Sequence, residues 1–327
     1  ALGAAFPMLG GDMNKNIIAS VIIILLTVLN LLGVDTSKRL NDLITVSKLV
    51  PLFAFICVGI FFVNGSNFTP VFLNDEYTPG SFAQAAVLLF FAYTGFEAIA
   101  VAAEDMDNPK KNLPRAIITV MVSVTVLYLL ILGVCIGAMG PELASSQAPV
   151  QDAFYKAIGP VGMYFVLAGT LLSMGGINFA QAFMAPRIAT ALSEDGMLPA
   201  VLSKRDKKNI PYVAAITTAV LSLLLAWSGS FTMLAAISAV SRFTQYLPTC
   251  IAVIVFRKKW AHKERPYKIP FGITIPLIAV VVSLWMLFQA TAAQLTWGLG
   301  GCIVILPFYV MYLRKKKAGL IKESEEL

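Results

Sequence analysis

The sequence predicts an all-α integral membrane protein with several transmembrane helices, and three observations support this fold class. The 327-residue chain is 58% hydrophobic and only 13% charged, whereas soluble domains carry about 25% charged residues. Backbone polar groups in lipid are satisfied only within helices or closed barrels. Apolar runs such as Val21 to Leu26 are continuous rather than alternating, which favours helices over barrel strands.

A helix needs about 20 apolar residues to cross the hydrocarbon core, and about nine such spans are expected. They run roughly over residues 17–34, 42–63, 83–104, 116–138, 161–192, 213–228, 231–256, 272–291 and 294–313. The fifth is long enough that part of it must tilt or leave the bilayer. We expect one transmembrane domain over residues 1–327.

Basic residues gather in alternate connections between these spans. They are Lys38, Arg39, Lys110, Lys111, Arg115, Lys204, Arg205, Lys207, Lys208, Arg257, Lys258, Lys259, Lys263, Arg265, Lys268 and Arg314 to Lys317. Lys156 is the main exception. This positive-inside pattern predicts that the basic loops and the C-terminus are cytoplasmic. It also accounts for the net charge of +7 without a nucleic-acid partner.

The sequence offers little material for an enzyme or a metal site. Its four cysteines each lie in an apolar run with no CxxC pair, and its single histidine lies in a basic loop. The cysteines are therefore expected to be small core residues rather than disulfides or metal ligands. We predict no enzymatic activity, no cofactor and no metal.

The third span contains the most distinctive motif, Phe90-Phe91-Ala92-Tyr93-Thr94-Gly95-Phe96-Glu97. Glycine weakens a helix by about 1 kcal/mol relative to alanine, and an acid at mid-membrane must face protein or water. A helix broken at Thr94-Gly95 would expose backbone N–H and C=O groups, which transporters use to hold charged substrate groups. The alternative is a packing glycine with a structural glutamate.

Three stretches together resemble the amino acid–polyamine–organocation (APC) permeases. Phe91 to Glu97, with Glu104 to Arg115, is similar to the sixth family helix and its loop. Ala189 to Pro199 resembles the end of the eighth helix, and Tyr246 to Cys250 the tenth. The resemblance covers nearly the whole chain, and its motifs end at predicted cytoplasmic loops.

The resemblance implies the LeuT-like five-helix inverted-repeat fold. The spans match family helices four to twelve, with the second repeat at about 83–256 and two further helices at about 272–313. Helices one to three have no counterpart, so an N-terminally truncated chain is expected. The implied function is transport of amino acids across the plasma membrane by alternating access. The substrate site would include Phe91, Ala92, Thr94, Gly95, Phe96 and Gln181.

Lys48 and Gln181 each allow two interpretations. In sodium-independent relatives a lysine of the fifth family helix occupies the place of a sodium ion, and Thr45 to Pro51 resembles that stretch. Otherwise Lys48 extends to the interface. Gln181 matches a family position that faces the substrate. Alternatively, Gln181 and Asn178 form hydrogen bonds with neighbouring helices.

Arg242 and Tyr246 lie four residues apart and share a helix face. Glu97 is the expected partner of one of them, and we expect it to act as a proton-sensitive gate. A tyrosine partner leaves the acid able to titrate, whereas an arginine partner keeps it ionised and structural. We favour Tyr246, because it matches the family motif.

Two other function classes compete with an amino acid transporter. One is transport of a polyamine or another organic cation, because Glu97 can hold an amine. The other is a non-transporting membrane scaffold, which would not need a glycine break, an acid and a lysine together. The expected partners are an amino acid, the lipid bilayer and, as a coupling ion, the proton. Symport and exchange both remain open.

Overall fold

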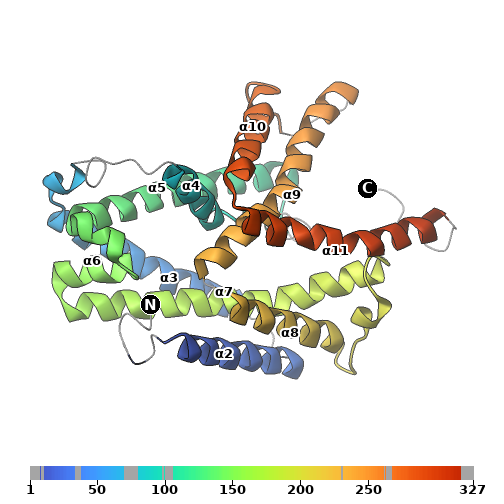
Figure 1. Cartoon of the computed structure of the whole chain (residues 1–327), viewed down its shortest axis with the longest axis horizontal. Helices are drawn as coiled ribbons and strands as arrows, with labels where there is room; N and C mark the ends of the chain where they lie inside the picture. Colours follow the sequence, from blue (N-terminus) through green and yellow to red (C-terminus); the bar gives the residue numbers. More distant parts are fainter. Residues whose placement is uncertain are drawn as a thin grey trace. The chain divides into compact units, whose positions relative to one another are not determined.

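The computed structural model describes residues 8, 11–33, 38–69, 80–97, 99, 106–229, 231–260, 262 and 267–317. Only the backbone is described at residues 38–44, 302, 304 and 315–317. The described part of the chain is mainly α-helical (Figure 1). This agrees with an all-helical membrane protein.

Each predicted span overlaps one apolar helix. The helices are α2 (Asp12–Leu32), α3 (Lys38–Gly59), α4 (Ser81–Ala92), α5 (Pro109–Met139), α7 (Pro160–Glu194), α8 (Tyr212–Ser228), α9 (Phe231–Lys259), α10 (Thr274–Gln289) and α11 (Ala292–Lys317). Six helices in the described residues are long and apolar enough to cross a membrane, whereas α4, α8 and α10 are shorter. The chain is thus a multi-pass membrane protein, while the count of nine crossings stays a prediction.

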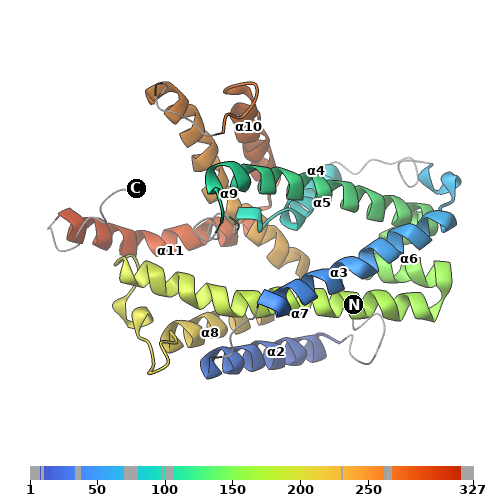
Figure 2. The same cartoon turned by 180° about the vertical axis from the view of Figure 1, so that it is seen from behind.

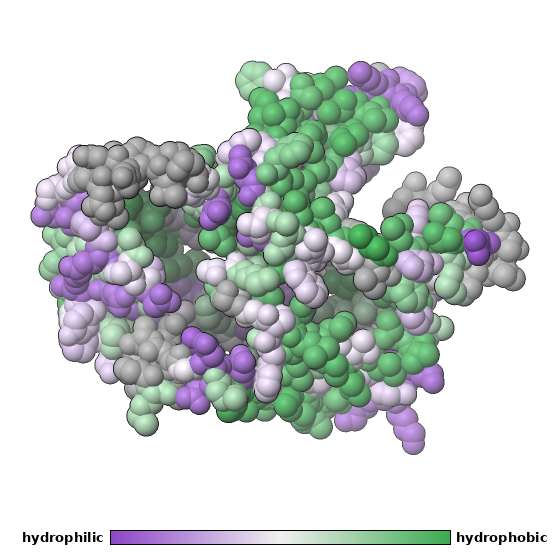
Figure 3. Space-filling model, in the orientation of Figure 1, coloured by the Kyte–Doolittle hydropathy of each residue, from purple (hydrophilic) through white to green (hydrophobic). Residues whose placement is uncertain are grey.

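Apolar side chains remain exposed along these helices, as expected for a protein whose solvent is lipid. Leu129 on α5 and Phe288 on α10 are 65% and 86% exposed. Figure 3 shows mainly apolar residues over α9 and α10, with hydrophilic residues at the tip of α9. That tip corresponds to Arg257, Lys258 and Lys259 in the last turn.

The chain divides into two compact units. Unit 1 comprises Ala1–Asp75, Tyr128–Ser228 and Pro307–Leu327, and unit 2 comprises Glu76–Leu127 and Gly229–Leu306. In unit 1, helices α2, α3 and α8 pack against α7 (Figures 1 and 2). A Cβ atom built on Gly169 would lie 2.3 Å from Cγ of Pro51. Gly169 therefore lets α3 approach α7 closely.

An additional short helix, α6 (Pro149–Ile158), was not predicted from the sequence. It is too polar and too short for a span, because it includes Gln151, Asp152 and Lys156. Its apolar face packs on α7 and α3, where the Phe154 ring meets Phe55 edge-on at 5.5 Å between ring centroids. The helix is therefore part of the core of unit 1.

In unit 2, helices α4, α9 and α10 pack together. Their core consists of Val87, Ala236, Ala239, Phe243 and Met286, with Phe90 and Phe91 packed against it. Small residues on α9 allow the other helices to approach closely. This core fixes the end of α4 beside the middle of α9.

Candidate functional site

The third predicted span is interrupted at the expected place. Helix α4 ends at Ala92, and Tyr93 to Gly95 form a turn. Gly95 has φ of +106°, a conformation that is open to glycine but strained for other residues. The predicted discontinuity at Thr94-Gly95 is therefore confirmed. Of the predicted 83–104 span, residues 98 and 100–104 lie outside the described part of the chain.

The N–H groups freed by this break are bound within the chain. The N–H groups of Tyr93 and Thr94 donate to the carbonyls of Phe90 and Phe91, each at 3.1 Å. The Gly95 N–H donates to Oε2 of Glu97 at 2.9 Å. The three amides after α4 are consequently satisfied, which lowers the cost of breaking a helix at membrane depth.

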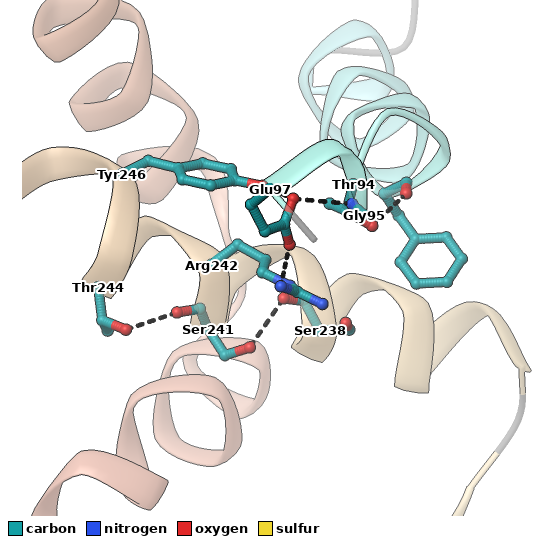
Figure 4. A network of polar contacts seen from close by, with 9 residues as sticks. Thr94, Gly95, Glu97, Ser238, Ser241, Arg242, Thr244 and Tyr246 are labelled. Carbon is teal, nitrogen blue, oxygen red and sulfur yellow. Dashed lines mark hydrogen bonds and ion pairs between the residues drawn. The ribbon is translucent and has the colours of Figure 1, made fainter. Parts of the chain in front are cut away.

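Glu97 lies at the centre of a polar network with two residues of α9 (Figure 4). Its Oε1 forms an ion pair with Nη1 of Arg242. Its Oε2 accepts a hydrogen bond from the Tyr246 hydroxyl at 3.0 Å. The expectation that Glu97 pairs with only one of them was wrong: positions four apart on a helix share a face, and a carboxylate has two oxygens.

The Glu97–Arg242 pair is only partly shielded from the surroundings. The side chain of Glu97 is 16% exposed and that of Arg242 is 36% exposed. A charge in a membrane span is costly unless it is paired or faces protein or water. This pair meets that condition and leaves one side of the guanidinium accessible.

Two phenylalanine rings pack against the ring of Tyr246. Phe96 stacks on the Tyr246 ring at 5.8 Å between centroids, and Phe90 meets it edge-on at the same distance. Phe90 also stacks on Phe243 at 4.8 Å. Phe91 contacts Phe231 at 6.1 Å. Phe90 and Phe96 therefore help to position the Tyr246 side chain.

Unit 1 contains the other two predicted site residues. Lys48 on α3 is half-buried, and it makes no ion pair or hydrogen bond with any residue that the structure describes. Gln181 on α7 is exposed. The amide of Asn178 donates to the Met174 carbonyl of its own helix at 2.8 Å, so the expected bond from Asn178 to a neighbouring helix is wrong.

The expectation for the cysteines holds only in part. Cys135 is buried and Cys250 is half-buried, but Cys57 is exposed. Cys57 lies on an apolar helix face, where exposure to lipid is as favourable as burial. The side chain of Cys302 lies outside the described residues.

Comparison with known proteins identifies the family. The profile described as amino acid permease matches residues 1–311. The chain belongs to the amino acid permease family of the APC superfamily. Members and relatives of this family are permeases and transporters rather than enzymes.

Three relatives show how far the similarity extends. A branched-chain amino acid permease, BcaP, of Bacillus subtilis is 30% identical over 92% of this chain and 64% of its own length. An uncharacterized transporter of Mycobacterium tuberculosis is 34% identical over 79% of this chain and 58% of its own length. A methylthioribose transporter of Bacillus subtilis is 28% identical over 96% of this chain and 67% of its own length. The chain therefore spans about 64% of the length of the first of these relatives.

Proposed function

We propose that the complete protein is a secondary transporter of amino acids that works by alternating access, with part of its substrate site at the break after α4. The observation that supports this most directly is the positive-φ Gly95 beside the Glu97–Arg242 pair, in a chain of the amino acid permease family. The five-helix inverted repeat at about 83–256 is part of the same proposal.

The chemistry of the break suits a zwitterion. Arg242 offers a guanidinium that can bind a carboxylate, and Glu97 offers a carboxylate that can bind an ammonium group. Backbone groups of Ala92, Thr94 and Gly95 would complete these contacts. Phe91 and Phe96 supply apolar surface next to the break, which favours a neutral amino acid with an apolar side chain.

Glu97 would act as a gate at this site. Its carboxylate holds the Gly95 N–H and Arg242, the same groups that a substrate carboxylate would bind. Substrate entry would therefore require Glu97 to release one of them. The ion pair with Arg242 favours the ionised form of Glu97, so Glu97 would take up a proton only after its release from Arg242, and this step would link the gate to protons. Exchange of one amino acid for another is the alternative form of coupling.

Lys48 supports transport without sodium. An ammonium on α3 would take the electrostatic role of the ion, and the adjacent turn is fixed because Pro51 packs on Gly169 of α7. Replacing sodium by choline at constant pH should leave uptake unchanged. A strict sodium requirement would refute this assignment of Lys48.

Two relatives are named for different substrates, so a second substrate class must be tested. A branched-chain amino acid permease and a methylthioribose transporter are both similar to this chain. Gln181, exposed on α7, would select between their substrates by hydrogen bonding. A polyamine is the third candidate, since Glu97 can bind an amine.

The test is counterflow into liposomes that contain the complete protein. Vesicles loaded with unlabelled leucine should accumulate labelled leucine, and loading with isoleucine or valine should also drive it. Loading with spermidine or methylthioribose should not. Counterflow with methylthioribose or spermidine alone would reject the amino acid substrate, and no counterflow with any compound would favour a scaffold.

A matched pair of variants distinguishes the site from general damage. Glu97→Gln removes the ion pair with Arg242, and Glu142→Gln removes an exposed pair with Lys156 in unit 1. We expect leucine counterflow to fall with Glu97→Gln and to remain at the wild-type rate with Glu142→Gln. An equal loss in both variants would contradict a substrate site at the break.

A further inference from the structure

A second polar site lies in unit 1, and none of the predicted site residues lines it. A cavity of about 470 Å³ opens beside the C-terminal end of α2 and the last part of α7. Its polar lining comes from Asn30, Arg187, Arg205, Lys208 and Asn209. Three of these five residues are basic and none is acidic, so the cavity is suited to an anion.

The three cations are not all neutralised. Arg205 forms an ion pair with Glu194 at 2.9 Å. The Lys208 ammonium group has one hydrogen-bond partner among the described residues, the Leu32 carbonyl, at 3.5 Å from Nζ. Arg187 forms no hydrogen bond or ion pair with any residue in the described ranges. Arg187 and Lys208 therefore face the cavity without a carboxylate partner among the described residues.

Arg187 is the most informative of the three. It lies seven residues before the end of α7 at Glu194, which corresponds to roughly 10 Å of helix rise. Arg187 is exposed and lines the cavity, so its charge is available to a ligand there. A guanidinium can bind two oxygens of a phosphate at once.

The walls of the cavity are fixed by internal hydrogen bonds. The Asn30 amide, only 6% exposed, donates to the Ala182 carbonyl of α7 at 2.5 Å. Asp206 accepts the N–H groups of Lys208 and Ile210, each at 2.8 Å. The loop that presents Lys208 is thus held in place before any ligand binds.

We propose that this cavity binds a phosphate group, and specifically the headgroup of an acidic phospholipid. Basic pockets between helices on the cytoplasmic side of a membrane bind such headgroups. The loop with Arg205 and Lys208 belongs to the side predicted to be cytoplasmic. The apolar wall, which includes Phe183 and Ile210, suits the start of an acyl chain.

Binding can be measured on the complete protein in detergent by native mass spectrometry. Phosphatidylglycerol should bind with higher affinity than phosphatidylcholine. Arg187→Gln and Lys208→Gln should each weaken phosphatidylglycerol binding by about tenfold, because each removes a charge-assisted hydrogen bond. The phosphate group could belong to a lipid or to free inorganic phosphate, and competition distinguishes the two. If inorganic phosphate does not displace phosphatidylglycerol, the site is a lipid site. If it does, the site also accepts free phosphate.

Lys207→Gln is the control, because Lys207 is exposed in the same loop and does not line the cavity. It should leave phosphatidylglycerol binding unchanged. Arg187→Lys keeps the charge and should restore part of the affinity. Equal binding of the two lipids, or an equal loss with Lys207→Gln and Arg187→Gln, would overturn the proposal. Since the readout is lipid binding, this result is independent of whether the protein transports amino acids.

Discussion

Helices α4 and α7 are both apolar and both contain or adjoin residues that disfavour a helix, yet only one is interrupted. Helix α7 continues over 35 residues although it includes Gly162, Gly169, Gly175, Gly176 and Pro186. Helix α4 ends after 12 residues, three positions before a single glycine. The number of glycines therefore does not determine where a membrane helix breaks.

The difference lies in what the glycines contact and what binds the freed backbone. On α7, a Cβ on Gly162 would lie 2.7 Å from the Phe154 carbonyl oxygen, and one on Gly169 would meet Pro51. These glycines allow neighbouring segments to pack closely against α7. After α4, Gly95 has φ of +106° and no atom of the described residues within 4 Å of a Cβ built on it, while Glu97 binds its N–H. A helix can end in a membrane where such a partner is present.

Removing the partner at the break should have the largest effect on stability. Glu97→Ala leaves Arg242 and the Gly95 N–H without their acceptor, so we expect the free energy of unfolding in mixed micelles to fall by about 1–3 kcal/mol. Glu142→Ala removes an exposed ion pair and should cost less than about 1 kcal/mol. Equal losses would mean that Glu97 does not stabilise the break.

A loss of stability of similar size is expected from tighter packing on α7. Gly169→Ala places a methyl group against Pro51, and overpacking of this kind should lower the free energy of unfolding by about 1–3 kcal/mol. The combined variant Gly169→Ala with Pro51→Ala, which removes the contact, should recover part of the loss. No recovery would show that the strain arises elsewhere.

A smaller loss is expected at Gly95. No atom of the described residues lies within 4 Å of a Cβ built there, so the cost of Gly95→Ala is assigned to the backbone conformation and should be about 1–2 kcal/mol. Gly95→Asn should cost less, because asparagine tolerates positive φ better than alanine does. Unfolding in mixed micelles measures both variants, and the reverse order would contradict a conformational origin.

The smallest predicted change is an increase in the free energy of unfolding rather than a decrease. Gly175 on α7 has a helical backbone, and a Cβ built on it would meet no described atom outside its own helix backbone within 4 Å. Gly175→Ala should therefore raise the free energy of unfolding by about 0.5–1 kcal/mol. The same measurement compares it with Gly95→Ala, and destabilisation by Gly175→Ala would remove the distinction between the two helices.

The sequence identified features that depend on local pattern. Long apolar runs located the helices, and a glycine with an acid two residues later located the break. It did not identify α6, whose polar residues hide an apolar face. Arg187 was not among the predicted site residues, although an arginine within an apolar helix indicates a polar site. This signal was present in the printed sequence.

Contacts between distant segments were harder to predict. Glu97 lies 145 residues from Arg242 and 149 from Tyr246, and spacing along the chain cannot say that both reach one carboxylate. The exposure of Cys57 also could not be predicted from the sequence. Lipid accepts an apolar side chain as readily as the protein core does, so hydropathy alone does not give burial.

The central claim is that Glu97 gates a substrate site at the break after α4. The most direct test is uptake of labelled leucine as a function of pH by the complete protein and by Glu97→Gln, with leucine binding measured in parallel. We predict that uptake by the wild type depends on pH and that Glu97→Gln removes this dependence while it still binds leucine. An unchanged pH profile in Glu97→Gln would show that Glu97 is a structural acid and would contradict the account.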